Sequence, residues 1–184
     1  MRLRVALFFA LSVQAVTLCA QAADPTPPEP AGIWTGPLQG AVPATITGGK
    51  VVDAAEVETL VAQEQAILID VAPWPHKPAN AADTWTAPPH RSLPGAVWLP
   101  DVGNGDIPPA LEAWYRARLK ALTRNNPAKP TIVFCHPNCW ASWNAAKRAI
   151  GYGYGRVYWY PDGVEGWQDS GRSTVVIETQ KRPG

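Results

Sequence analysis

Uninterrupted apolar runs of strand length, separated by segments with helical periodicity, limit the fold of this 184-residue chain more than any other feature. Residues 66–71 and 131–134 lack the alternation of a strand with one solvated face, and such runs are typical of strands buried on both faces of a parallel sheet. Shorter runs at 96–99 and 156–160 fit the same sheet. The order predicts an α/β fold, with a mainly parallel central sheet and helices on both faces.

Helical signals lie between these runs. Asp53 is suited to capping a helix, and Asp106 is suited to capping another that has Pro108 near its first turn. The apolar face of the first helix would comprise Val57, Leu60 and Val61. The buried stripe of the second would comprise Leu111, Trp114, Tyr115, Leu119 and Leu122.

Two further helices and the chain ends complete the predicted order. We expect a helix from about Trp140 that stops at Gly151, and a short helical piece between Asp162 and Trp167. The core domain would span residues 50–170. Residues 171–184 form a tail in which an edge strand is an option near 174–178.

The N-terminus has the pattern of a secretory signal at residues 1–22. Arg2 and Arg4 precede a mostly apolar stretch, and small residues end it, so we place the cleavage after Ala22. We therefore expect a periplasmic or secreted protein with no membrane span once the signal is removed. The remaining chain carries fourteen basic and fifteen acidic residues, which argues against a nucleic-acid partner.

Two segments are rich in proline and show no periodicity. Residues 23–49 are interpreted as an extended linker, and a plain spacer is favoured over a docking arm. Residues 72–95 are too long for an ordinary connection in a compact domain. A lid beside the active site and a plain surface excursion are equally compatible with that segment.

The candidate chemistry follows the run at 131–134. Cys135 comes directly after it, at the carboxyl edge of the predicted sheet, where open α/β folds bind ligands. The next residues lead to the helix expected from Trp140, and unpaired N–H groups at a helix start favour negative charge. We therefore expect the Cys135 sulfur to lie beside that helix start and to react as a thiolate.

A second cysteine, Cys139, lies four residues further along. In an oxidising compartment it would pair with Cys135 or resolve a sulfur adduct on it, and an inert structural disulfide is the alternative. We predict Cys135 and Cys139 as catalytic residues and no metal site. The predicted substrate-binding loop comprises His136, Pro137, Asn138, Trp140, Ala141 and Ser142.

A family resemblance follows from the order of short motifs. These are residues 68–71 (Leu-Ile-Asp-Val), His90 with 93–96 (Leu-Pro-Gly-Ala), Cys135 between a strand and a helix, and Asp162-Gly163 before Gly166-Trp167. In this order they resemble a rhodanese-like domain over about residues 50–168. That resemblance implies that Cys135 carries a persulfide, as an intermediate rather than a bound cofactor, and passes sulfur to an acceptor.

A finer resemblance rests on the residues around the cysteines. Phe134-Cys135, Cys139-Trp140 and residues 142–149, followed by 159–163 (Trp-Tyr-Pro-Asp-Gly), are similar to the PQQ-dependent catabolism-associated CXXCW motif proteins. Three residues separate the cysteines here rather than two. The resemblance implies an exported protein associated with quinoprotein alcohol oxidation, with a quinoprotein dehydrogenase or its cytochrome as partner.

The chain also departs from the rhodanese pattern. An arginine is usual five residues after the cysteine, where this chain has Trp140, and an arginine is also common where Ala72 follows the strand. Without these cations, thiosulfate lacks its usual charge partners, so sulfurtransferase activity toward thiosulfate is doubtful. Asp70, at the same sheet edge, is predicted to support the site, either by bonding the cysteine loop or by satisfying nearby backbone.

Three functions therefore remain open. The chain is a sulfur carrier using Cys135 with a small sulfur donor or a protein thiol acceptor, or a thiol–disulfide or copper-handling protein using both cysteines. The third option is a non-catalytic accessory of a quinoprotein dehydrogenase. The fold alone does not decide between them.

Overall fold

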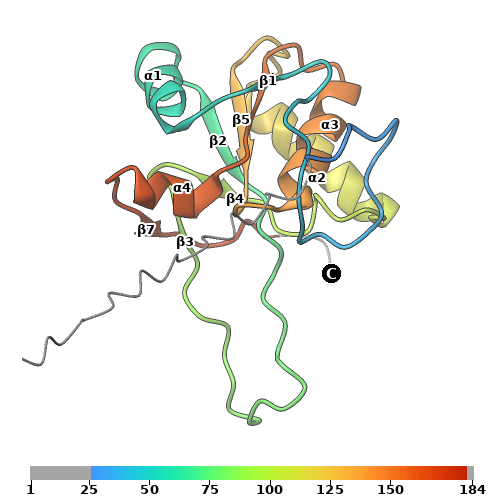
Figure 1. Ribbon diagram of the computed structural model, residues 1–184, viewed down its shortest axis with the longest axis vertical. Helices are drawn as coiled ribbons and strands as arrows, with labels where there is room; N and C mark the ends of the chain where they lie inside the picture. The colour runs from blue at the N-terminus through green and yellow to red at the C-terminus, as the bar shows by residue number, and fades with distance from the viewer. Residues whose placement is uncertain (1–25, 182–184) are drawn as a thin grey trace, which may run out of the picture.

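A computed structural model describes residues 26–181 of the chain, so the predicted signal at 1–22 lies outside the described residues. Five strands form a parallel sheet in the order β1-β6-β5-β2-β4 (Figure 1). They are β1 (Lys50–Val51), β2 (Ile67–Asp70), β4 (Val97–Trp98), β5 (Thr131–Phe134) and β6 (Val157–Tyr160). The predicted fold class is confirmed, because strands and helices alternate and the central sheet is parallel.

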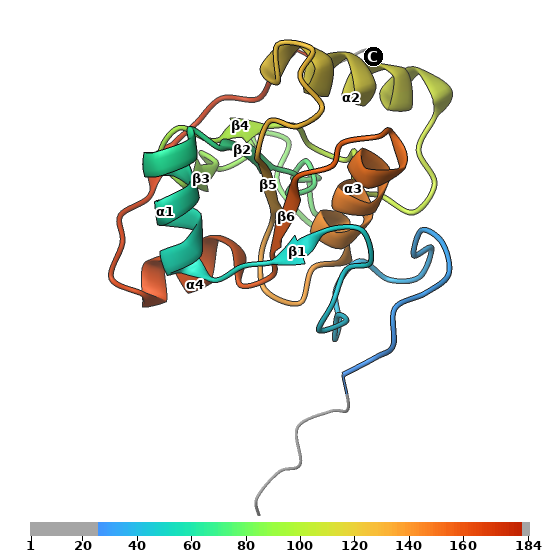
Figure 2. The ribbon, with the colours of Figure 1, turned by 90° about the horizontal axis from the view of Figure 1, so that it is seen from above.

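Helices cover both faces of this sheet, as Figure 2 shows from above. On one side lie α1 (Ala54–Glu64) and α4 (Gly163–Asp169), and on the other lie α2 (Pro109–Leu122) and α3 (Trp140–Gly151). Alternate residues of β5 serve the two cores: Ile132 and Phe134 pack with α1 and α4, whereas Val133 packs with α2 and α3. Burial on both faces explains the continuous apolar runs.

The start of α1 agrees with its predicted cap. Asp53 accepts a hydrogen bond from the Glu56 N–H at 2.8 Å, and the Glu56 carboxylate accepts one from the Asp53 N–H at 3.2 Å. This reciprocal capping box satisfies N–H groups that have no partner within the helix. Val57 and Leu60 are buried as predicted, but the prediction for Val61 is wrong, since its side chain is exposed.

The start of α2 differs from the prediction. The helix begins at Pro109 behind Pro108, no side chain caps it, and Asp106 remains exposed in the preceding loop. Proline fits a first helical turn because its missing N–H has no partner there in any case. Of the predicted stripe, Tyr115 and Leu119 are buried, and the other three residues pack half-buried against the core.

The C-terminal tail is not an edge strand of the main sheet along its predicted length. Its strand β7 (Val175–Val176) pairs antiparallel with β3 (Arg91–Ser92) in a separate two-stranded sheet. The tail then reaches the edge of the main sheet at one bridge, between Thr179 and Trp98. No helix within residues 26–181 is long and apolar enough to cross a membrane.

Candidate functional site around the cysteine pair

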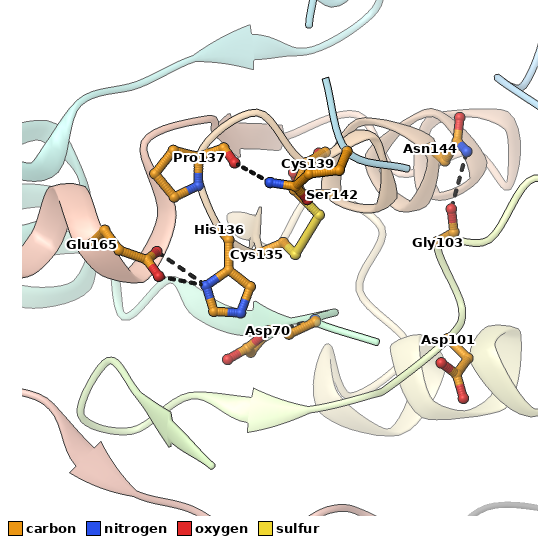
Figure 3. The surroundings of a disulfide bond; sticks show 12 residues. Asp70, Asp101, Gly103, Cys135, His136, Pro137, Cys139, Ser142, Asn144 and Glu165 are labelled. Atoms are coloured by element: carbon orange, nitrogen blue, oxygen red, sulfur yellow. Dashed lines mark hydrogen bonds and ion pairs between the residues drawn. A yellow bond between two sulfur atoms is a disulfide. The ribbon is translucent and has the colours of Figure 1, made fainter. Parts of the chain in front are cut away.

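Cys135 and Cys139 form a disulfide at the carboxyl end of β5 (Figure 3). Their Cα atoms are 6.3 Å apart, and the loop of three residues between them leads directly into α3. Parallel strands all end at this edge of the sheet, so β2 brings Asp70 to the same edge. The two predicted catalytic residues are therefore brought together.

Cys135 is bonded to the residue that begins α3, and the structure adds which of the two cysteines caps the helix and how deeply each is buried. Cys139, not Cys135, is the N-cap residue of α3. Cys135 is fully buried in the core between the sheet, α2 and α3, and Cys139 is 3 % exposed. The strand direction explains the difference, because Cys135 continues the side of β5 that Val133 presents to this core. Upon reduction, the helix start would favour the thiolate of Cys139.

The loop between the cysteines is partly exposed. His136 points towards α4, where its Nδ1 lies 2.8 Å from Glu165 Oε1 (Figure 3). Asn138 has a positive φ of 55°, a backbone conformation that asparagine tolerates better than most residues. The carbonyl oxygens of Pro137 and Asn138 both accept hydrogen bonds from an N-terminal segment. The middle of the predicted loop therefore serves as an attachment point for another part of the chain.

The first turn of α3 is buried. Trp140 packs face to face with Trp34, and the backbone of Ala141 lies directly against Gly103. The Ser142 hydroxyl donates to the Cys139 carbonyl at 3.0 Å and accepts from the Trp159 indole N–H at 2.9 Å. Trp140, Ala141 and Ser142 therefore shape the helix start without facing solvent.

Residues 26–49, here called the arm, contain no helix and only one bridged residue, Gln39, before β1, yet they are not a spacer. Gln39 pairs with Cys139 as an antiparallel bridge, and the Leu38 carbonyl accepts the Trp140 N–H at 2.8 Å. The buried Asn144 amide holds Trp34 through both its N–H and its carbonyl. The arm thus lies across the cysteine loop and α3.

The Glu29 carboxylate is held by hydrogen bonds within the arm. Glu29 accepts hydrogen bonds from the Thr45 hydroxyl and the Thr47 N–H, at 2.5 and 2.9 Å. Partial burial works to raise the pKa of Glu29, but these hydrogen bonds outweigh it and leave the pKa below its ordinary value. Lys147 of α3 lies 3.8 Å away and adds a favourable charge. The arm is therefore tied to α3 at both of its ends.

Asp70 is fully buried and accepts three hydrogen bonds. They come from the Ala72 N–H at 2.9 Å, the Ser92 hydroxyl at 2.6 Å and the His90 ring at 2.7 Å. None of these groups belongs to the cysteine loop, so the alternative in which Asp70 bonds that loop is wrong. Asp70 instead joins the two ends of the 72–95 segment.

The 72–95 segment is anchored at its ends and extends away from the body between them, as the green excursion in Figure 1 shows. Trp98 stacks between His90 and Trp74, with ring centroids 3.9 and 5.1 Å away. The Trp98 indole N–H also donates to the Ala72 carbonyl at 2.8 Å. The middle of the segment therefore does not close over the cysteines as a lid would.

A pocket of about 320 Å³ lies between the ends of that segment and α4. Its lining comprises Ala72, Pro73, Pro75, Pro88, Pro89, His90, Arg91, His136, Val164, Glu165 and Gln168. No group of three or more His, Cys, Asp or Glu that could hold a metal ion is present among the described residues. The pocket is therefore lined by His136 of the cysteine loop and by Glu165 of α4, which contact each other.

Sequence reasoning missed several residues of this site. Glu165 contacts His136, which lies 29 positions earlier in the chain, and Asn144 contacts Trp34, which lies 110 positions earlier. Neither contact has a local sequence pattern. Gly163 was part of the Asp162-Gly163 pair noted in the sequence, and its φ of 57° is a conformation that glycine adopts readily.

Comparison with known proteins matches residues 53–170 to the family described as the rhodanese-like domain. No curated protein matches the chain. Among solved structures, the chain is similar to a thiosulfate sulfurtransferase from Pseudomonas aeruginosa, with 19% identity and a TM-score of 0.46 over 74% of this chain and 22% of that one. An uncharacterized protein from Saccharomyces cerevisiae is 18% identical, with a TM-score of 0.40 over 66% of this chain and 92% of that one. YnjE is 18% identical, with a TM-score of 0.45 over 77% of this chain and 35% of that one.

Proposed function

This chain belongs to the rhodanese-like domain family, and on that premise we propose that Cys135 accepts sulfane sulfur and that Cys139 displaces it. The observation that carries the proposal is the disulfide between these residues at the end of β5. A second cysteine already in contact with the sulfur-carrying residue can resolve an adduct without a large rearrangement of the loop. A cysteine that is buried only for packing would not require a second cysteine bonded to it.

The loading step starts from the reduced pair. The Cys135 thiolate attacks the terminal sulfur of a sulfane-sulfur donor, such as an organic persulfide. A new bond forms between Cys135 Sγ and that sulfur, while the donor's sulfur–sulfur bond breaks and the donor leaves as a thiolate with the electron pair. Cys135 then carries a persulfide.

The release step uses Cys139. Its thiolate attacks Cys135 Sγ, forms the disulfide and displaces the terminal sulfur as hydrosulfide, which takes up the proton that Cys139 gave up. The disulfide is then reduced by a partner dithiol, which becomes oxidised as the two cysteines regain their electrons. The proposed partners are thus a small sulfur donor and a dithiol.

The proposal also covers the compartment and the wider process, and for these it rests on sequence patterns alone. The N-terminal pattern at 1–22 supports export to the periplasm or beyond, where disulfides persist. The residues around Cys135 and Cys139 support an association with PQQ-dependent alcohol catabolism, with a quinoprotein dehydrogenase or its cytochrome as partner. Deleting the gene from the host should then impair growth on alcohols. Unchanged growth would contradict this part of the proposal.

The proposed chemistry is tested by intact mass spectrometry of the reduced protein. Separate samples of the reduced protein are treated with thiosulfate, inorganic tetrasulfide or cysteine persulfide. The Cys139→Ser variant should retain an adduct of about +32 Da, because nothing displaces the sulfur. The wild type should instead lose about 2 Da and release one hydrosulfide per chain.

The Cys135→Ser variant is the matched control, and it should carry no adduct. An unmodified Cys139→Ser variant after treatment with all three donors would overturn the proposal. If the wild type in that case still cycles between disulfide and dithiol, the pair is a thiol–disulfide exchange site. An adduct on Cys139 in the Cys135→Ser variant alone would reverse the assigned roles.

A further inference from the structure

Residues 30–44 of the arm form a loop whose two ends meet. Glu29 accepts hydrogen bonds from the Thr45 hydroxyl and the Thr47 N–H, and these bonds close the base of the loop. The base is joined to α3, because the Lys147 ammonium donates to the Thr47 carbonyl at 3.1 Å. A loop with joined ends can move as a unit while its base stays in place.

The tip of this loop, residues 34–40, lies across the second cysteine. Gln39 forms an antiparallel bridge with Cys139, and the carbonyl oxygen before Gln39 accepts the Trp140 N–H at 2.8 Å. Cys139 is 3 % exposed and Cys135 is fully buried. The disulfide is therefore closed to a reagent as long as the tip is in place.

The contacts of the tip lie outside the central sheet. Trp34 stacks on Trp140 with ring centroids 4.5 Å apart, and Leu38 packs half-buried against the core. The Asn144 amide bonds the Trp34 carbonyl and N–H, at 2.9 and 2.8 Å. Lifting the tip would break these contacts and the bridge to Cys139 but no pairing between strands of the sheet. Such local opening costs less free energy than unfolding of the whole domain.

The other surroundings of the cysteines are less able to move. Cys135 lies in the core between the sheet, α2 and α3. On the α4 side, Val164 donates its N–H to the Cys135 carbonyl at 3.0 Å, but Val164 is itself buried in the second core. The pocket between the 72–95 segment and α4 is lined by neither cysteine. The arm is therefore the segment whose movement uncovers Cys139 at the smallest cost to the fold.

We propose that the tip of the arm is a cover that must lift from the start of α3 before any reagent reaches the cysteine pair. Lifting also frees the Trp140 N–H in the first turn of α3, next to Cys139. Unpaired N–H groups at a helix start favour negative charge, so the open state stabilises a thiolate on Cys139. The inference deepens the proposed function, because it states how a sulfur donor and a dithiol would reach the two sulfur atoms.

The cover is tested by the rate at which tris(2-carboxyethyl)phosphine reduces the disulfide of the oxidised full-length protein, followed by alkylation and mass. No sulfur transfer is measured, so the persulfide chemistry can fail while this inference holds. Trp34→Ala should accelerate reduction roughly tenfold, because the tip loses the burial and stacking of an indole. Leu38→Ala should accelerate it roughly threefold. Trp34→Phe, which keeps an aromatic ring, should stay within about twofold of the wild type.

Trp74→Ala is the matched control. Trp74 is also half-buried and stacks on another tryptophan, Trp98, with ring centroids 5.1 Å apart, but it belongs to the 72–95 segment. Its loss should leave the reduction rate within about twofold of the wild type. Hydrogen exchange of the Trp140 amide gives a second readout, because the arm protects this N–H. Trp34→Ala should raise the exchange rate by the same factor as the reduction rate.

Two results would overturn the inference. If Trp34→Ala and Leu38→Ala are reduced as slowly as the wild type, the tip does not limit access, whether or not exchange at Trp140 rises. If Trp74→Ala is accelerated as much as Trp34→Ala, the reagent enters through the 72–95 segment or through unfolding of the whole domain. Leu38→Ala carries the same comparison on its own if Trp34→Ala does not fold.

Discussion

At the scale of single residues, Gly163 joins the cysteine loop to α4. Its φ of 57° is the left-handed conformation, and a Cβ atom built there would meet the Cys135 carbonyl and lie 2.8 Å from the His136 Cα. Without that atom, the neighbouring Val164 N–H approaches the Cys135 carbonyl to 3.0 Å. The position thus needs glycine both for its backbone conformation and for space.

Gly163→Ala should therefore destabilise the fold by about 3 kcal/mol, from the left-handed conformation and from overpacking against backbone. Gly171→Ala is the control, since its φ is also positive, at 81°, but nothing lies within 4 Å of its added Cβ. That variant should cost only about 1 kcal/mol. Urea unfolding of both proteins measures the difference, and equal losses would contradict the steric account.

At the scale of elements, the starts of α1 and α2 are built differently. Asp53 and Glu56 cap α1 reciprocally, and Lys50 adds an exposed ion pair to Glu56 at 2.9 Å. The first turn of α2 relies on Pro108 and Pro109 and has no side-chain cap. Asp53 therefore caps its helix and Asp106 does not, although the sequence predicted both as caps.

Asp53→Ala should lower the free energy of unfolding by about 1 kcal/mol, because it leaves a first-turn N–H of α1 without its acceptor. Asp106→Ala should stay within about 0.5 kcal/mol of the wild type, since Asp106 is exposed and caps nothing. Thermal or urea unfolding at neutral pH tests the pair. A loss for Asp106→Ala as large as that for Asp53→Ala would contradict the assignment of the α2 start.

The same contrast shows how far sequence patterns reach. The apolar run at 131–134 predicted β5 correctly, because burial on both faces is a property of the run itself. The arm was misinterpreted because its proline-rich composition says nothing about Asn144, whose buried amide bonds Trp34 across 110 residues. The complete burial of Cys135 also had no sequence signal, because its side chain continues the alternation of β5 into the core although the strand itself ends at Phe134.

At the scale of the whole molecule, Tyr115 and Tyr160 are each buried in one of the two cores, and Tyr152 is partly buried against one of them. Burial raises the pKa of Tyr115 and of Tyr160, and burial together with the nearby Glu112 raises the pKa of Tyr152 to about 12. In the unfolded chain these phenols lose their protons near pH 10. Above that pH the native protein therefore binds more protons than the unfolded chain does.

The free energy of unfolding should consequently fall as the pH rises above about 10, by up to about 1.4 kcal/mol per pH unit for each proton that the native state alone retains. Tyr160→Phe offers a matched test, because the Tyr160 hydroxyl is buried with no hydrogen-bond partner among the described residues. The variant should be as stable as the wild type at about pH 8, and its free energy of unfolding should fall less than that of the wild type between about pH 10 and 11. Identical slopes in urea titrations would contradict the shifted pKa.

The arm also bears on the order in which the molecule can assemble. Trp34 precedes its hydrogen-bonding partner Asn144 by 110 residues, and Thr45 precedes the Trp143 indole that it accepts from by 98. Contacts of such long separation close only after the intervening chain has been made and the sheet beneath α3 has formed. The stretch that leaves the ribosome early is thus among the last to settle, and until then the two sulfur atoms stand uncovered on that side.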